Sequence, residues 1–243
     1  MNTQYIEVIN NLTKEIEETQ SDVIEKVSDL CTEAIKNERM LFFFGTGHSH
    51  MICEEPFYRA GGLIPVYPIL EPALMLHEGA YKSTFIERID GIGKILIQES
   101  KISKGDILFL VSNSGRNNAV VEMAIESKKM GITTVALTSL KHSRTVSSRH
   151  KSGKKLYEIA DYVIDNCGIP GDAAIKFKGL DQRVAPTSSM TCILIVNIIV
   201  TNIIEKLLSL GITPPVFMSS NTDEGDRFNK VLIEKYRSKI KIL

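Results

Sequence analysis

The chain has 243 residues, of which 43% are hydrophobic, and 29 Lys and Arg residues balance 29 Asp and Glu residues to a formal net charge of zero. This length suffices for one large α/β domain with a complete core, and no Pro-rich or Ser-rich linker divides it, so we expect a single domain over residues 1–243. The balanced charge lacks the electrostatic signature of a nucleic-acid-binding protein, which leaves a small molecule as the expected ligand.

The cysteines and the most apolar segment indicate the cellular location of the protein. The four cysteines are widely spaced without a C-x-x-C pair, and no signal-peptide pattern is present, so we expect reduced thiols in a cytoplasmic protein. The most apolar run, residues 192–204, is shorter than the roughly 20 residues that a membrane span needs, and it contains Asn197 and Asn202. We therefore expect a buried core helix there and no membrane partner.

A long amphipathic helix is the first predicted element. Apolar residues recur every three or four positions from Tyr5 to Ile35, with Glu and Lys between them, which predicts a helix over residues 4–36 with a break near residues 19–21. Its apolar stripe is long enough to cover both a sheet and a second subunit. We therefore expect a homodimer or a homotetramer.

A strand buried on both faces is expected at residues 40–44, which are all apolar, and it ends in Gly45-Thr-Gly-His-Ser-His50. We expect a helix from Ser49 through Ala60, stopped by two glycines. The two glycines of the motif allow a ligand to approach the backbone closely, as in dinucleotide-binding loops. His50 replaces the third glycine of that pattern, and a nicotinamide site would leave the later Ser-rich loop without a role.

The histidines of this motif also suggest a metal. On a helix that begins at Ser49, His50 and Glu54 share one face, but the sequence does not single out the further ligands that a zinc site needs. We expect no metal and no other cofactor. The polar groups of residues 46–50 are then expected either to contact a sugar or to cap the helix.

A second strand is expected over residues 63–70, followed by a mixed segment over residues 71–102. Pro72 favours a short helix at the start of this segment. His77 and Glu78 lie where the periodicity fails, and polar residues in an irregular segment after a strand often carry function.

The most informative stretch is the apolar strand at residues 106–111, which ends in Ser112-Asn-Ser-Gly-Arg-Asn-Asn118. A helix is expected over residues 119–131, with its apolar residues on one stripe and a closing glycine. Ligands of open parallel sheets bind beyond the carboxyl ends of the strands, where a helix N-terminus offers N–H groups to an anion. Arg116 is the only cation of the loop, so we expect a compact anion, a phosphate monoester. The alternative is that these residues only cap the helix.

The rest of the chain supplies two more strands, at residues 133–139 and 162–165, and an irregular stretch over residues 167–184. Ala185-Pro-Thr-Ser-Ser189 then opens an apolar helix to Leu210, with Thr187 as its expected cap. A terminal helix is expected over residues 223–239. Residues 141–155 are rich in Lys and Arg, which indicates either a solvated loop or a basic lip to the anion site.

Three motifs together resemble the sugar isomerase (SIS) domain family, whose members bind phosphosugars: Gly45-Thr-Gly-His-Ser49, Ser112-Asn-Ser-Gly115 and Ala185-Pro-Thr-Ser-Ser189. The likeness covers residues 31–210, to which the helices at 4–36 and 223–239 are appended. The chain looks most like an uncharacterised bacterial subgroup, and it is more distantly similar to phosphoheptose and arabinose-5-phosphate isomerases. The resemblance implies an α/β fold of the flavodoxin-like three-layer type, with a parallel sheet of about five strands.

The resemblance also implies which residues hold a phosphorylated sugar or amino sugar. Ser112 and Ser114, with the backbone at Asn113 and Gly115, would bind the phosphate, and Asn117 replaces a third hydroxyl. Thr46 and Ser49 would approach the sugar, and Ser188 and Ser189 would close the site. His48 and Ser139, which follow two of the strands, are added as sugar contacts. The catalytic histidine that phosphoheptose isomerases carry on the late helix has no counterpart among residues 187–210.

Aldose–ketose isomerisation needs one base that moves a proton between adjacent carbons, and an acid helps to open the ring. Glu78 is the preferred base, because its apolar neighbours would desolvate it, with His77 as the acid. Glu55 is the alternative base, although the helix dipole would lower the pKa of a carboxyl group there. A phosphosugar lyase or etherase needs the same base and a non-catalytic phosphosugar sensor needs none, so both are alternatives to an isomerase.

Overall fold

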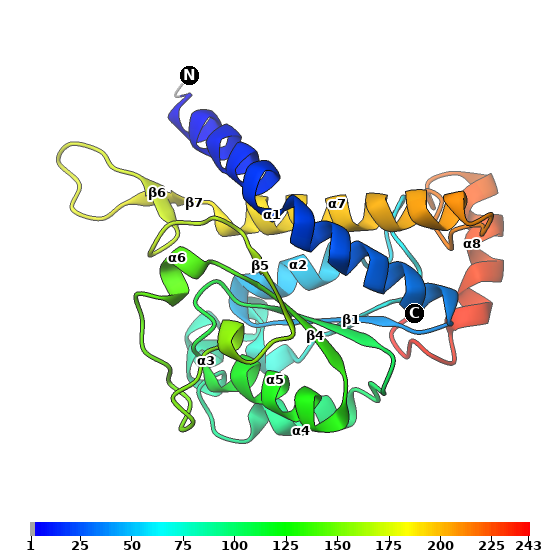
Figure 1. The fold of residues 1–243 in the computed structure, drawn as a ribbon, viewed down its shortest axis with the longest axis horizontal. Helices are drawn as coiled ribbons and strands as arrows, with labels where there is room; N and C mark the ends of the chain where they lie inside the picture. Colours follow the sequence, from blue (N-terminus) through cyan, green and yellow to red (C-terminus); the bar gives the residue numbers. More distant parts are fainter. Residues whose placement is uncertain (1–2) are drawn as a thin grey trace.

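A five-stranded parallel sheet forms the centre of the molecule (Figure 1). The structure is a computed structural model that describes residues 3–243. The strand order is β2-β1-β3-β4-β5, and all four pairings are parallel, which confirms the predicted fold class. The strands are β1 (Leu41–Gly45), β2 (Val66–Ile69), β3 (Ile107–Val111), β4 (Thr133–Thr138) and β5 (Tyr162–Asp165).

The central strands are buried on both faces, as their continuous apolar sequences predicted. In β1, alternate side chains point to opposite sides, so Leu41 and Phe43 enter one core while Phe42 and Phe44 enter the other. Phe43 stacks on Phe109 of β3, with ring centroids 4.4 Å apart. Burial on both faces fixes these strands rigidly and leaves only their ends for function.

Helices cover both faces of the sheet, which gives the expected three layers (Figure 1). The first core lies against α1 (Gln4–Lys36), α2 (His50–Glu54) and α7 (Ser188–Ser209), and the second lies against α4 (Ile92–Glu99) and α5 (Asn118–Met130). The other helices are α3 (Ala80–Ile86), α6 (Leu140–Ser143), α8 (Asp223–Tyr236) and the 3-10 helices η1 (Gly47–Ser49), η2 (Pro72–Leu74), η3 (Leu76–Glu78) and η4 (Leu156–Glu158).

Two helices differ from their sequence-based bounds. The break expected near residues 19–21 is wrong, because the hydroxyls of Thr19 and Ser21 donate to carbonyls four residues earlier and α1 continues. The helix expected through Ala60 is also wrong, since α2 ends at Glu54. Pro56 lacks an N–H and cannot donate to the carbonyl four residues earlier, which accounts for the early end.

Two segments are more regular than the sequence indicated. Residues 71–102 contain α3 and α4. The stretch expected to be irregular, residues 167–184, contributes β6 (Ala173–Ile175), which pairs antiparallel with β7 (Val184–Pro186). These strands have three residues each, too few for an alternating pattern to be recognisable. The terminal helix ends at Tyr236, three residues before the expected bound.

The apolar helix α7 is long and apolar enough to cross a membrane, and it is the one such helix among residues 3–243. In the fold its buried stripe, which includes Ile195, Ile199 and Ile203, joins the core shared with α1 and the sheet. Core helices of globular proteins pass the same length and composition test, so the packing is the more informative observation.

The surface between α1 and α7 carries a groove of about 570 Å³. Its floor includes Ile16, Ile24, Leu194 and Ile198, and acidic side chains from α1 lie at its rim. The amino-terminal part of α1 and the β6–β7 hairpin project from the rest of the molecule (Figure 1). The apolar stripes of α1 and α7 are thus not fully covered by this chain, which favours the predicted association.

We predict that the protein is a dimer or a higher oligomer, with a particle at least twice the 27.1 kDa of one chain in light scattering at micromolar concentration. Ile198→Glu places a charge in the groove and should give a particle of one chain's mass, because a buried unpaired charge opposes association. Ile95→Glu, on the exposed side of α4, is the control and should leave the mass unchanged. A 27.1 kDa particle for the native protein would contradict the prediction.

Candidate functional site

The strand order reverses direction between β1 and β3, which pair from Leu41 with Ile107 to Gly45 with Val111. The chain leaves β1 toward β2 on one side and leaves β3 toward β4 on the other, so a crevice opens beyond their carboxyl ends. Thr46 and Ser112 are the next residues of the two strands, at neighbouring positions across this crevice. The first two of the three sequence motifs therefore lie beside one another.

A small cavity of about 20 Å³ marks where the three motifs meet. It is lined by residues from the loop after β1, the end of β3 and its loop, and the start of α7. These are His48, Ser49, Ile52, Val111, Asn113, Ser188, Ser189 and Cys192. Five of the sequence-predicted ligand contacts thus surround one point, although they are up to 141 positions apart in the chain (residues 48 and 189).

The loop over residues 112–118 is shaped by internal hydrogen bonds. The Gly115 N–H donates to Ser112 Oγ over 3.1 Å, and Gly115 has a positive φ of 58°. A Cβ at this position would lie 3.1 Å from the Leu156 Cβ, so both the backbone angle and the available space favour glycine. The Ser114 hydroxyl makes no hydrogen bond within residues 3–243, and the first N–H groups of α5 have no intrahelical partner.

Asn113 is held by a buried network. Its Oδ1 accepts a hydrogen bond of 3.0 Å from Nδ2 of Asn166, which is fully buried, and Asn166 Oδ1 accepts one of 2.9 Å from the Gly168 N–H. Asn166 Nδ2 also lies 3.3 Å from Sγ of Cys192, and burial raises the pKa of this thiol to about 12. The Asn113 side chain is therefore held in place by Asn166, which also contacts the neutral thiol of Cys192.

Three arginines give the rim of this loop a positive charge. Arg149 donates from Nη1 to Asn117 Oδ1 over 2.7 Å, and its N–H donates to the Arg116 carbonyl. Burial, and then the charges of Arg116 and Arg88, lower the pKa of Arg149. None of the three forms an ion pair within 4.0 Å among residues 3–243. The positive charges of these arginines repel one another and are not neutralised by a carboxylate. A bound anion would therefore stabilise them.

Buried polar atoms without hydrogen-bond partners in the described part of the chain lie in the loop and in α6 beside it. They are Nε of Arg116, Oδ1 of Asn118 and Oγ of Ser143. Buried polar atoms are usually paired, and unpaired ones often mark a site that binds water or an ion. Together with the charges of the arginines, this observation supports ligand binding at the loop.

The basic stretch at residues 141–155 contributes little else to this rim. Lys141 pairs with Glu15, Lys151 pairs with Asp90, and Lys155 donates to backbone carbonyls of residues 143 and 146. Most of the stretch is thus held by contacts within the protein, and Arg149 is the residue that reaches the loop.

The cap of α7 differs from the expected one. Thr187 occupies the N-cap position, but its side chain makes no capping bond. Instead, Asp172 Oδ1 accepts from the N–H groups of Thr187 and Ser188 at 3.0 and 2.8 Å, and Oδ2 accepts from the Ser188 hydroxyl at 2.7 Å. The carboxylate also favours the positive end of the helix dipole. Ser188 is thereby engaged, whereas the half-buried Ser189 makes no side-chain hydrogen bond within residues 3–243.

Ser139 is fully buried and its hydroxyl is already in use. It donates to the Gly168 carbonyl over 2.6 Å and accepts from the His142 N–H at the start of α6. Ser139 therefore joins the segment at Gly168 to the start of α6, and it does not line the cavity.

Glu87 is a carboxylate that the sequence analysis missed. Its Oε2 accepts from the Thr46 hydroxyl over 2.7 Å, and its backbone carbonyl accepts from the Ala119 N–H at the start of α5. The side chain is partly buried, and it lies close enough to Arg149 to raise the pKa of that residue. Glu87 thus links the loop after β1 to the helix after β3.

The three proposed catalytic residues lie elsewhere. Glu78 is exposed, with 48% of its side chain accessible, and pairs with Lys82 at 3.6 Å, so the desolvation that we expected is absent. His77 is exposed, with its ring centroid 6.3 Å from that of His50. Glu55 pairs with Arg59 and accepts from Asn197 at 3.0 Å. Asn197 is eight residues beyond Ser189, or about 12 Å along α7.

Comparisons with known proteins agree with this architecture. A family model described as the SIS domain matches residues 4–139. A UPF0309 protein of Shouchella clausii is 42% identical over 98% of this chain and 97% of its own length, and one of Halalkalibacterium halodurans is 43% identical over 96% and 97%. The third motif, at residues 185–189, lies outside the range that the family model matches.

Solved structures of the same fold include the phosphoheptose isomerase GmhA of Neisseria gonorrhoeae, with a TM-score of 0.55, 14% identity, and coverage of 84% of this chain and 96% of that one. A protein of Methanococcus jannaschii gives a TM-score of 0.51 at 16% identity, with coverage of 84% and 92%. At such low identity these likenesses show the fold alone.

We predict that Asn166→Ala destabilises the protein by about 1–3 kcal/mol, because the change leaves the partly buried Asn113 Oδ1 and the buried Gly168 N–H without partners. Urea unfolding followed by circular dichroism measures the change. Asn221→Ala, at an exposed turn, is the control and should change stability by less than about 0.5 kcal/mol. Equal stabilities for the two variants would contradict the network.

Proposed function

Because the chain belongs to the SIS domain family and to the UPF0309 proteins, we propose that it binds a phosphorylated sugar or amino sugar and catalyses aldose–ketose isomerisation. The observation that carries the proposal is the loop at residues 112–118, where a free hydroxyl, a helix N-terminus and unpaired arginines gather beyond the switch point of the sheet. The fold shared with a phosphoheptose isomerase supports the same ligand class.

The phosphate would lie against the start of α5. Ser114 offers a free hydroxyl, and the N–H groups at the start of the helix other than that of Ala119, together with the positive dipole end, favour an anion. Arg116 and Arg149 add charge at the rim, where charge-assisted hydrogen bonds are stronger than neutral ones. The phosphate is therefore assigned to this loop.

The sugar would extend from the phosphate toward the small cavity. Ser49, His48 and Ser189 line it with side chains that make no hydrogen bond within residues 3–243, so their donors and acceptors are available to sugar hydroxyls. Ser188 and Ser139 are engaged by protein partners and would act by holding the loops. Thr46 would act by orienting the Glu87 carboxylate.

We assign the base to Glu87 in place of Glu78. Isomerisation requires a carboxylate that removes a proton from the carbon beside the carbonyl and returns it to the neighbouring carbon. Glu87 is oriented by Thr46 and lies between the loop after β1 and the start of α5, whereas Glu78 is exposed and paired with Lys82. His48, in the cavity, would serve as the acid that opens the ring.

Ser114→Ala should weaken the binding of a sugar phosphate by on the order of 1.5–3 kcal/mol, the range for a hydrogen bond to a charged group. The free energy of unfolding should barely change, because Ser114 makes no hydrogen bond within residues 3–243. Calorimetric titration with a panel of sugar phosphates measures affinity. Ser209→Ala, at the far end of α7, is the control. Unchanged affinity together with a large loss of stability would show that Ser114 is structural.

Glu87→Gln should keep ligand-induced thermal stabilisation but abolish the exchange of the proton beside the carbonyl with deuterated water, because an amide cannot act as the base. Glu78→Gln is the matched control and should exchange at the native rate. Proton NMR of a bound sugar phosphate measures the exchange. If Glu78→Gln loses exchange while Glu87→Gln keeps it, the sequence-based assignment is correct. If the native protein binds the ligand but exchanges no proton, the protein is a sensor.

A further inference from the structure

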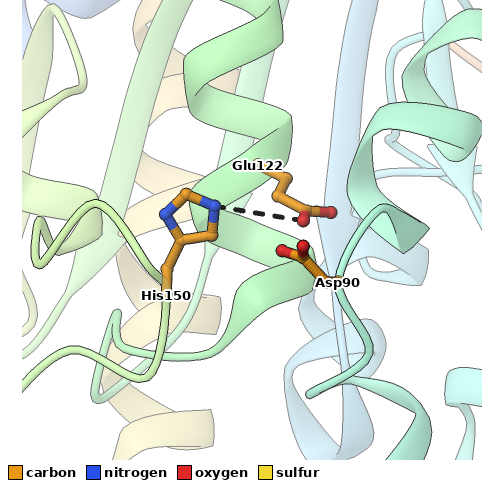
Figure 2. Close-up of side chains that lie close together, drawn as sticks. All are labelled: Asp90, Glu122 and His150. Atoms are coloured by element: carbon orange, nitrogen blue, oxygen red, sulfur yellow. Dashed lines mark ion pairs between the residues drawn. The ribbon is translucent and has the colours of Figure 1, made fainter.

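Three side chains form a cluster at a place where a turn, a helix and a loop meet (Figure 2). None of the three lines the small cavity. We propose that Asp90, Glu122 and His150 form a binding site for a first-row divalent cation such as Zn²⁺ or Mn²⁺. Asp90 precedes α4, Glu122 is in α5, and His150 is in the loop after α6. Each offers one ligand atom, and these atoms lie within 4.8 Å of one another.

Glu122 is a buried anion that is held in a fixed position. Its side chain is 8% exposed, Oε1 accepts from the Gly91 N–H at 2.6 Å, and Oε2 accepts from the Gly93 N–H at 2.9 Å. Only glycine fits at position 93, because a Cβ there would lie 2.3 Å from the Ala119 carbonyl oxygen. The absence of a side chain lets α4 pack directly on α5. A carboxylate has about four acceptor sites, so two hydrogen bonds leave room for a metal.

His150 supplies the independent observation that points to a ligand. Its side chain is 6% exposed, and Nε2 points toward the Glu122 carboxylate (Figure 2). The distance to Oε1 is 3.9 Å, too long for a hydrogen bond, and Nε2 has no hydrogen-bond partner in the described part of the chain. Two ligand atoms that each bind one ion at about 2.1 Å lie roughly 3–4 Å apart. The gap therefore fits an ion better than a direct contact.

The other ring nitrogen has a hydroxyl oxygen within hydrogen-bond distance, which could orient the ring when Nε2 binds an ion. Nδ1 lies 2.8 Å from Ser152 Oγ and also accepts from the Ser152 N–H at 3.2 Å. An ion on Nε2 would require the ring proton to be on Nδ1, which would then donate to Ser152 Oγ and give up the hydrogen bond that it accepts from the Ser152 N–H. Ligating histidines usually donate their second N–H in this way, which fixes the ring orientation.

Asp90 completes the site from the solvent side. Its side chain is 56% exposed and pairs with Lys151 at 2.8 Å, but Lys151 is 74% exposed, and such surface pairs are weak. A divalent ion between two carboxylates and an imidazole would displace this lysine. One imidazole with two carboxylates favours Zn²⁺ or Mn²⁺ over Ca²⁺, which takes oxygen ligands alone, and the exposed side leaves positions for water.

The consequence of binding would be structural. The ion would join three segments that are separated in sequence, and it would fix the loop whose Arg149 reaches Asn117. The proposal does not depend on a sugar phosphate, because the ion and its ligands are tested without one.

Calorimetric titration of tag-free, EDTA-dialysed protein with ZnCl₂ and with MnCl₂ tests the proposal, with MgCl₂ and CaCl₂ as comparisons. We expect one equivalent of Zn²⁺ or Mn²⁺ to bind and to raise Tm. Asp90→Asn keeps the shape of an exposed side chain and should weaken binding about tenfold or more, since even partners behind a ligand contribute that much. His150→Gln should remove the one-equivalent binding.

His77→Gln is the matched control, because His77 lies near His50 at a different place on the surface and could bind metal adventitiously. It should bind as the native protein does. No stoichiometric binding by the native protein at tens of micromolar metal, or binding that Asp90→Asn and His150→Gln leave unchanged, would overturn the proposal. Loss of binding in His77→Gln alone would also overturn it. If His150→Gln does not fold, the Asp90→Asn titration still decides.

Discussion

The parallel pairing of β1 with β3 is the constraint on which the candidate site depends. Both strands are buried on both faces, so their side chains are committed to packing and only their carboxyl ends are free. The chain leaves these ends in opposite directions, and the resulting crevice brings Thr46 beside Ser112. The helix that follows β3 adds a positive dipole end at the same place, which makes the crevice a natural site for an anion.

The parts of the fold that follow from local patterns were predictable from the sequence. All five strands lie in short apolar runs, which are typical of strands that a sheet buries on both faces, and all except β2 end in or beside small polar residues. The loop at residues 112–118 was also predictable, since a helix needs one cap and this loop carries five Ser and Asn residues. The early end of α2 was available in the sequence as well, because Pro56 cannot continue a helix.

The parts that depend on contacts between distant segments were not predictable. Asp172 caps α7 from 15 residues away, and Glu87 meets Thr46 across 41 residues. Neither residue has a local signal, because a lone acidic residue in a loop usually faces solvent. For Glu78, only the expected desolvation is wrong: its neighbours Leu74 and Met75 are buried, but Glu78 itself remains exposed beside Lys82.

An amide-resolved NMR titration of the ¹⁵N-labelled protein, first with inorganic phosphate and then with hexose and hexosamine 6-phosphates, tests directly whether a phosphate binds at residues 112–118. If the phosphate binds at the start of α5, the amide signals of Ser114, Arg116 and Asn117 should shift with both ligands. The sugar phosphates alone should also shift Ser49 and Ser189 at the cavity. Shifts confined to the groove between α1 and α7, or no saturable shift at residues 112–118, would contradict it.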